Sequence, residues 1–251
     1  LPPRMHQVTS NKTIIGIGAN SGFANGGLNI GLPFREGVTA PPADAIRNVI
    51  IRNLRFANSA DDAINIQMFT HHVWIDHCDL SNAFDGLIDI RFGSSYVTVS
   101  WNRFSQHSKT SLVGADDSNA ALDVGRLKVT YHHNWFDGSI ERHPRVRYGE
   151  PVHVFNNFYL NNAGYGVGCF QNSGCVIEGN SFENVAVPIT INGPTDAGRA
   201  VERLNIYVRS GSPITGGAVI EPYTFYSYVL DKAEDVRGAV AQGAGVGKLR
   251  F

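Results

Sequence analysis

The feature that most constrains this chain is a β-rich segment that recurs along its middle at nearly constant spacing. Each copy alternates apolar and polar residues and closes on an aromatic residue or a leucine. The closing residues are Phe56, Leu80, Phe104, Phe136, Tyr159 and Phe182, so the steps are 24, 24, 32, 23 and 23 residues. A period near 23 is too short for a propeller blade and fits one coil of a β-solenoid.

The repeat predicts an all-β chain folded as a right-handed parallel β-helix. Equivalent strands of successive coils pair in such a solenoid, and parallel crossovers are right-handed. We predict a single domain over residues 1–251, with segments 10–18 and 26–31 as earlier coils and 202–210 as a further strand. Residues 230–245 have helix-like content and end at glycines, so we expect this C-terminal segment to pack on the solenoid or to cap it.

Two local features support this interpretation. Asn102, Asn134, Asn157 and Asn180 fall at the same phase of four successive units, which predicts a stacked column of hydrogen-bonded side chains. Four ordinary turn asparagines are the alternative. The single long step contains residues 115–125, which we interpret as a loop inserted into one coil.

Composition limits the function classes. The chain has 21 Lys and Arg against 22 Asp and Glu, which argues against a protein built to bind nucleic acid. The longest apolar stretches are far shorter than a membrane span. The chain opens without a visible signal peptide, although a mature secreted form would look the same. We expect a monomer.

The three cysteines leave one question open. Cys169 and Cys175 bracket a short turn-like stretch, and this spacing suits a disulfide and two free buried thiols equally well. Cys78 lies in an apolar run, where we expect a buried small residue. No Cys or His spacing in the sequence matches a zinc site.

The coil period also places charged side chains together. Asp62, Asp85, Lys109 and Arg142 each follow the closing residue of their unit by five or six positions. We therefore predict a file of these side chains on one face, with neighbours about 4.8 Å apart, as adjacent strands are. Asp89 extends the acidic end of this charge file and Arg147 extends the basic end.

The division by sign suggests a ligand. Three carboxylates on adjacent coils repel each other unless a cation lies among them, and Ca²⁺ accepts irregular oxygen ligands. A network of surface salt bridges is the alternative. A calcium ion beside fixed cations would suit a polyanion carrying carboxylates, such as a polymer of uronic acids.

The sequence resembles the pectate lyase family of right-handed parallel β-helix enzymes. The likeness runs from "SNKTIIG" to "GNSFENV" and includes, in the family's order, "VWIDHCDL", "DGLIDI", "VTVSWNRF", "VTYHHNWF" and "RHPRVR". It implies a secreted enzyme that cleaves α-1,4-polygalacturonate by β-elimination with the help of Ca²⁺.

The resemblance also implies a metal-ligand set. Asp62 in "DDAINI" and the pair Asp85 and Asp89 in "DGLIDI" match the family's calcium ligands. Some members carry a further carboxylate where this chain has Ala60. We expect Asp61 or water to complete the coordination shell in this chain.

The resemblance assigns the cations as well. Lys109 in "HSKTSLVG" matches the lysine that binds a substrate carboxylate, and Arg147 matches an arginine that grips a carboxylate through two hydrogen bonds. Arg142 matches the base that removes the proton from C-5. A free guanidinium has a pKa above about 12, so such a base requires neighbouring positive charge to favour its neutral form.

Three other functions remain as alternatives. A pectin lyase would act on a neutral methylated polymer and would not need the acidic cluster. A polygalacturonase-like hydrolase needs paired carboxylates, and the adjacent Asp61 and Asp62 would face opposite ways on a strand. A catalytically silent β-helix that only binds polysaccharide is the third.

Overall fold

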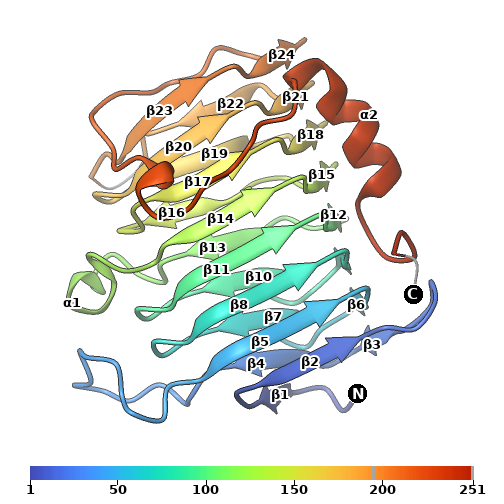
Figure 1. Cartoon of the computed structure of the whole chain (residues 1–251), viewed down its shortest axis with the longest axis vertical. Coiled ribbons are helices and arrows are strands. Elements are labelled where there is room, and N and C mark those ends of the chain that lie inside the picture. The colour runs from blue at the N-terminus through green and yellow to red at the C-terminus, as the bar shows by residue number, and fades with distance from the viewer. Residues whose placement is uncertain (194–195, 250–251) are drawn as a thin grey trace.

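The protein folds as a parallel β-helix built from three sheets of eight strands each. This is a computed structural model, and it describes residues 1–193 and 196–249. Successive coils stack along the long axis of the molecule, so that every strand pairs with its counterpart in the next coil (Figure 1). The predicted fold class is therefore confirmed.

The strands of each sheet succeed one another along the axis in chain order. Sheet A contains β1 (Met5–Val8), β4 (Gly27–Ile30), β7 (Ile64–Ile66), β10 (Ile88–Ile90), β13 (Ser111–Val113), β16 (Arg145–Arg147), β19 (Tyr165–Phe170) and β22 (Val187–Thr190). Sheet B contains β2 (Lys12–Ile15), β5 (Arg47–Arg52), β8 (His71–Asp76), β11 (Ser95–Ser100), β14 (Val129–His132), β17 (Val152–Phe155), β20 (Gly174–Glu178) and β23 (Arg199–Arg203). Sheet C contains β3 (Gly22–Ala24), β6 (Arg55–Ala57), β9 (Asp79–Ser81), β12 (Arg103–Ser105), β15 (Trp135–Asp137), β18 (Phe158–Leu160), β21 (Ser181–Glu183) and β24 (Ile206–Val208).

The closing residues of the repeat form one column inside the solenoid. Phe104 and Phe136 are paired in register and their ring centroids lie 5.0 Å apart. Tyr159 continues this stack at 4.8 Å and Phe182 at a further 4.3 Å, with near-parallel rings. The sequence period is thus the spacing at which one aromatic side chain lies on the next, which buries large apolar surfaces in the core.

The predicted asparagine column is also present. In each successive pair, the Oδ1 atom of the later residue accepts hydrogen bonds from both the backbone N–H and the side-chain amide of the earlier one, at 2.8–3.1 Å. Asn205 continues the column by accepting from Asn180. The four predicted members are buried, where an unpaired backbone N–H would be costly. The column gives these N–H groups an acceptor at the bend, where pairing within the sheets is interrupted.

The C-terminal segment packs on the outside of the solenoid. After the short helix η1 (Pro222–Thr224), helix α2 (Ala233–Gly243) lies alongside the strands of sheet C (Figure 1). Its residues Val236 and Val240 pack against Phe158, with Trp101 and Trp135 at the margin. This confirms the packing expected from the sequence.

The insertion at residues 115–125 carries helix α1 (Ala120–Asp123). It leaves the neighbouring strands undisturbed, since Val97 pairs in register with Val129 across it. The loop is tied down where the Asp123 Oδ1 atom accepts a hydrogen bond from the Gly93 amide at 2.7 Å.

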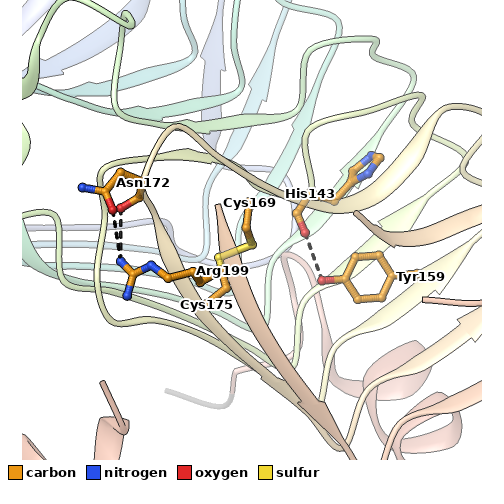
Figure 2. The surroundings of a disulfide bond; sticks show 6 residues. All are labelled: His143, Tyr159, Cys169, Asn172, Cys175 and Arg199. Atoms are coloured by element: carbon orange, nitrogen blue, oxygen red, sulfur yellow. Dashed lines mark hydrogen bonds between the residues drawn. A yellow bond between two sulfur atoms is a disulfide. The ribbon is translucent and has the colours of Figure 1, made fainter. Parts of the chain in front are cut away.

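The cysteine question is settled in favour of a disulfide. Cys169 on β19 and Cys175 on β20 are bonded, and Figure 2 shows this bridge close to His143 and Tyr159. Cys78 is free and buried, as expected. Within the described residues, no helix is long and apolar enough to cross a membrane.

Candidate active site

The acidic residues gather where the chain enters sheet A. Asp62 lies just before β7, Asp85 lies in the turn before β10, and Asp89 lies within β10. Asp62 and Asp89 are buried, whereas the Asp85 side chain is 41% exposed. Parallel pairing of β7 with β10 brings these positions onto adjacent coils, as the period predicts.

A glycine allows the carboxylates to approach this closely. A Cβ atom at Gly86 would lie 2.1 Å from Asp89 Oδ1 and 3.1 Å from Asp62 Oδ1. The Gly86 amide instead donates a 2.8 Å hydrogen bond to Asp62 Oδ1. The glycine of "DGLIDI" is therefore required by the packing of the acidic side chains over this turn.

Burial makes the negative charge of this cluster costly. It raises the pKa of Asp62 to about 6, although the nearby Arg91 and the Gly86 hydrogen bond act in the opposite direction. Burial also raises the pKa of Asp89 well above its usual range, and the Asp62 carboxylate adds to the effect. Arg91 contacts the cluster through a 3.2 Å ion pair between its Nη2 atom and Asp62 Oδ2.

The cluster has the donors and the geometry that a hard cation needs. One carboxylate oxygen from each of Asp61, Asp62 and Asp85 lies within 4.8 Å of the other two. Two oxygens that share a Ca²⁺ at about 2.4 Å lie no further apart than this. Moreover, Asp89 Oδ1 is buried and has no hydrogen-bond partner among the described residues. We conclude that the residues present fit a calcium ion.

Lys109 joins the acidic cluster to the basic residues. Its Nζ atom lies 2.8 Å from Asp85 Oδ1, so the file is continuous from acid to base. The residue opposite Lys109 on the next coil is Glu141, and Arg142 is one position further on. Lys109 and Glu141 each follow the closing residue of their coil by five positions, and Arg142 follows by six, so the offset of one residue is the one that the sequence spacing predicts.

Arg142 lies in the turn that leads into β16. Its backbone is left-handed, with φ of 66°, and its carbonyl accepts a hydrogen bond from Ser111 at 2.8 Å. The Nε atom is buried without a hydrogen-bond partner among the described residues. The neighbouring acid is Glu141, whose Oε1 atom is 3.6 Å from Nε. The following residue is anchored from inside the coil, where the Tyr159 hydroxyl donates to the His143 carbonyl at 3.0 Å (Figure 2).

Arg147 is held by the inserted loop. Its Nε atom donates to Asp117 Oδ1 at 2.6 Å, and its Nη1 atom lies 3.4 Å from the Ala115 carbonyl. The Tyr148 hydroxyl also donates to the Asp117 carbonyl. Part of the guanidinium fork expected to grip a substrate is therefore engaged by the protein itself.

The two adjacent acids do not follow strand alternation. Asp61 and Asp62 were expected to face opposite ways, yet their carboxylates lie in one cluster. Both precede β7 and lie in irregular backbone, where side chains do not alternate. Asp85 likewise lies outside β10, so its direction relative to Asp89 is set by the turn.

The structure adds residues that the sequence reasoning missed. Arg91 follows Asp89 by two positions, and this period-two spacing was a usable signal. Glu141 precedes Arg142 and follows Phe136 by five positions, just as Lys109 follows Phe104, so the spacing could have indicated that it lies opposite Lys109. Asp117 carried no such signal, because an inserted loop lies outside the repeat.

The comparisons with known proteins agree with this architecture. A sequence profile described as "Pectate lyase" matches residues 4–249. The pectate trisaccharide-lyase of Thermotoga sp. (strain RQ2) is 36% identical, with 100% of this chain and 75% of that protein covered. Pectate lyase A of Dickeya chrysanthemi is 33% identical, with 96% and 70% covered.

The solved structures lead to the same family. A pectate lyase from Bacillus sp. N165, determined in complex with trigalacturonate, superposes with a TM-score of 0.82 at 30% identity, covering 98% of this chain and 78% of that one. The profile match, the sequence identities and the shared solenoid together show that the chain belongs to the pectate lyase family.

Proposed function

We propose that the protein is a secreted, calcium-dependent lyase that cleaves α-1,4-polygalacturonate by β-elimination. The observation that carries this proposal is the continuous file of charge on sheet A. It passes from the carboxylates of Asp61, Asp62 and Asp85, with Asp89 beside Asp62 at the Gly86 turn, through Lys109 to Arg142. A carboxylated polymer is too large to enter a cell, so the enzyme would act outside it.

The acidic end would hold the ion. Asp62, Asp85 and Asp89 would be the ligands, because Asp62 and Asp85 lie in the cluster of close oxygens and Asp89 Oδ1 faces the same Gly86 turn as Asp62 Oδ1. Asp61, the third member of that cluster, would be available as a fourth carboxylate. When bound, Ca²⁺ supplies a positive charge that neutralises a substrate carboxylate and stabilises the charge developing beside C-5.

The chain's own cations supply the remaining steps. Lys109, with 44% of its side chain exposed, still has N–H donors for the substrate carboxylate beyond its bond to Asp85. Arg142, in its neutral form, would accept the proton from C-5, after which the C4–O bond breaks and the sugar becomes unsaturated. Its Nε atom has no hydrogen-bond partner within the described residues, and the nearest acid there is Glu141 at 3.6 Å.

One assay distinguishes the candidate functions. Polygalacturonate is incubated with the protein, with and without a chelator, while the ultraviolet absorbance of the unsaturated product is followed. Absorbance that requires calcium supports the lyase. New reducing ends without absorbance would instead identify a hydrolase, and neither signal would identify a binding protein.

The ligand set is tested by calorimetry without any substrate. Asp89→Asn keeps the shape of the side chain and removes a buried charge, so we expect the affinity for Ca²⁺ to fall about tenfold or more. The matched control is Asp44→Asn, at an exposed acid that forms a surface ion pair with Arg35. Equal calcium affinity in both variants would remove Asp89 from the ligand set.

A further inference from the structure

An open depression adjoins the charge file on its upstream side. It has a volume of about 470 Å³ and lies at the corner between sheets C and A. Its lining comes from three successive coils and consists of Asn82, Ala83, Phe84, Gln106, His107, Ser108, Gly138 and Ile140. We call it the Phe84 depression.

The sequence positions tie this depression to the charge file. Phe84 immediately precedes Asp85, Ser108 immediately precedes Lys109, and Ile140 lies two positions before Arg142. Each of the three coils thus contributes first to the depression and then to the file. Because the depression and the file cross the same three coils side by side, a polymer bound along the file would have the depression along its flank, within reach of the substituents of those sugar residues that point away from the cations.

The frame of the depression is fixed by backbone hydrogen bonds between coils. The Ile140 amide donates to the His107 carbonyl at 3.0 Å, and the Phe84 amide donates to the Ser59 carbonyl at 2.9 Å. The side chains of Phe84 and Ile140 are nevertheless 80% and 47% exposed. Large apolar side chains that are exposed beside a candidate active site are suited to contact a ligand.

The lining is uncharged. Among the described residues that form it there is no Lys, Arg, Asp or Glu. Its one titratable group is His107, whose Nε2–H donates to the Asp85 carbonyl. Gln106 and Ser108 provide polar groups without charge.

The depression is uncharged, whereas the adjoining file is charged. From this contrast we infer that the Phe84 depression is a subsite for an uncharged, methyl-esterified galacturonate residue. An ionised carboxylate placed there would lose water and gain no cation in return. A methyl ester would instead bury its methyl group against Phe84 and Ile140, and its carbonyl would accept a hydrogen bond from Gln106 or Ser108. The inference rests on the proposed function, because it assigns a free carboxylate to the charge file and an ester to the adjoining position.

The test compares two substrates of equal chain length, polygalacturonate and a partly methyl-esterified galacturonan. The measured quantity is the ratio of kcat/KM on the esterified polymer to kcat/KM on the free acid. Phe84→Ala removes one aromatic contact and should lower this ratio about five- to tenfold. Ile140→Lys adds a cation to the lining and should lower the ratio further by favouring the free carboxylate.

The matched control is Tyr223→Ala, which removes an aromatic side chain that is 65% exposed on η1, away from sheet A. Its ratio should equal that of the parent. All three substituted side chains are substantially exposed, so the variants should fold. A ratio unchanged in Phe84→Ala, or equal losses on both polymers, would overturn the ester subsite.

A binding experiment separates this inference from the proposed function. The affinities of fully methyl-esterified trigalacturonate and of free trigalacturonate are measured in the presence of chelator. We expect Phe84→Ala to weaken the esterified trimer about five- to tenfold and the free trimer less. If the polymer is not cleaved but this difference is found, the lyase proposal fails and the subsite stands. If the polymer is cleaved but the difference is absent, the subsite fails alone.

Discussion

Arg142, the proposed base, is held in place through its backbone and that of the next residue. It lies in a left-handed turn, its carbonyl is held by Ser111, and the next residue is anchored by Tyr159. Its Nε atom is buried yet unpaired among the described residues. Leaving such a donor without a partner costs stability, and substrate contact is a role that would offset this cost.

We predict that Arg142→Lys lowers kcat by about 10²-fold or more, which is the usual contribution of a general base. The pH–rate profile is measured for the parent and the variant. The control is Arg35→Lys, at an exposed arginine that forms a surface ion pair with Asp44, and it should stay within about twofold of the parent. If Arg142→Lys keeps substantial activity and its pH–rate profile is unchanged on the alkaline side, Arg142 is excluded as the proton acceptor.

Asp117 is a positioning residue that orients Arg147. Its carboxylate forms a 2.6 Å ion pair with Arg147, and Asp117→Asn removes the charge of this pair, so KM should rise about three- to tenfold with a smaller effect on kcat. The control is Asp116→Asn, because Asp116 accepts from Ser118 within its loop and an amide oxygen can replace that acceptor. Equal effects of the two substitutions would mean that Asp117 merely supports the loop.

At the scale of elements, the sequence predicted what repeats and missed what does not. The stacked aromatic residues and the asparagine column follow from the period, because every coil places the same residue at the same phase. The pairing of Lys109 with Glu141 follows from it too, because each lies five positions after the closing residue of its coil. The contact of Asp117 with Arg147 could not be predicted, because an inserted loop has no counterpart from which its path can be inferred.

The asparagine column is expected to contribute strongly to stability. Asn157→Ala would remove the acceptor of the Asn134 amides and leave buried backbone groups unpaired. We expect the free energy of unfolding to fall by about 3 kcal/mol or more, measured by chemical denaturation. The end member Asn205 is only partly buried, so Asn205→Ala should cost clearly less. Equal costs would show that the column does not act as a chain of buried hydrogen bonds.

The inserted loop contains a carboxylate that opposes folding at neutral pH. Burial raises the pKa of Asp123 to about 6, and its Oδ2 atom has no partner among the described residues. Because the folded-state pKa lies above the unfolded value, its stabilising protonation is lost as the pH rises through about 6.

Asp123→Asn should therefore be more stable than the parent at pH 8, by about 1–3 kcal/mol, while keeping an oxygen that accepts from Gly93. The gain should vanish below about pH 4, where the parent is protonated in both states. Denaturant unfolding of both proteins across this pH range measures the difference. A gain that is independent of pH would contradict the assignment.

At the scale of the whole molecule, a single apolar core runs through all the coils. Buried residues from Val8 in the first coil to Ala200 near the last belong to one contiguous cluster. The period alone predicted this continuity, because each coil can bury its apolar face only against its neighbours. The outer helix α2 was predicted from composition, and its docking site on Phe158 was not, because no repeat governs it.

Such a core should unfold in one cooperative transition. Thermal unfolding followed by circular dichroism and by tryptophan fluorescence should give coincident curves, because Trp74, Trp101 and Trp135 lie on successive coils. Separate transitions for the two signals would indicate that part of the solenoid unfolds independently, and would argue against the single domain expected from the sequence.

The insertion at residues 115–125 has a consequence for how such enzymes diversify. It lengthens the circumference of one coil while the pitch of the solenoid stays constant, since the strands before and after it remain in register. A corner of this kind tolerates insertions and deletions. Chain can be added or removed there without shifting the charge file, and the added chain can still reach the file, as Asp117 reaches Arg147. Evolution and protein engineering can therefore vary how the cleft holds its cations by editing one corner of the coil.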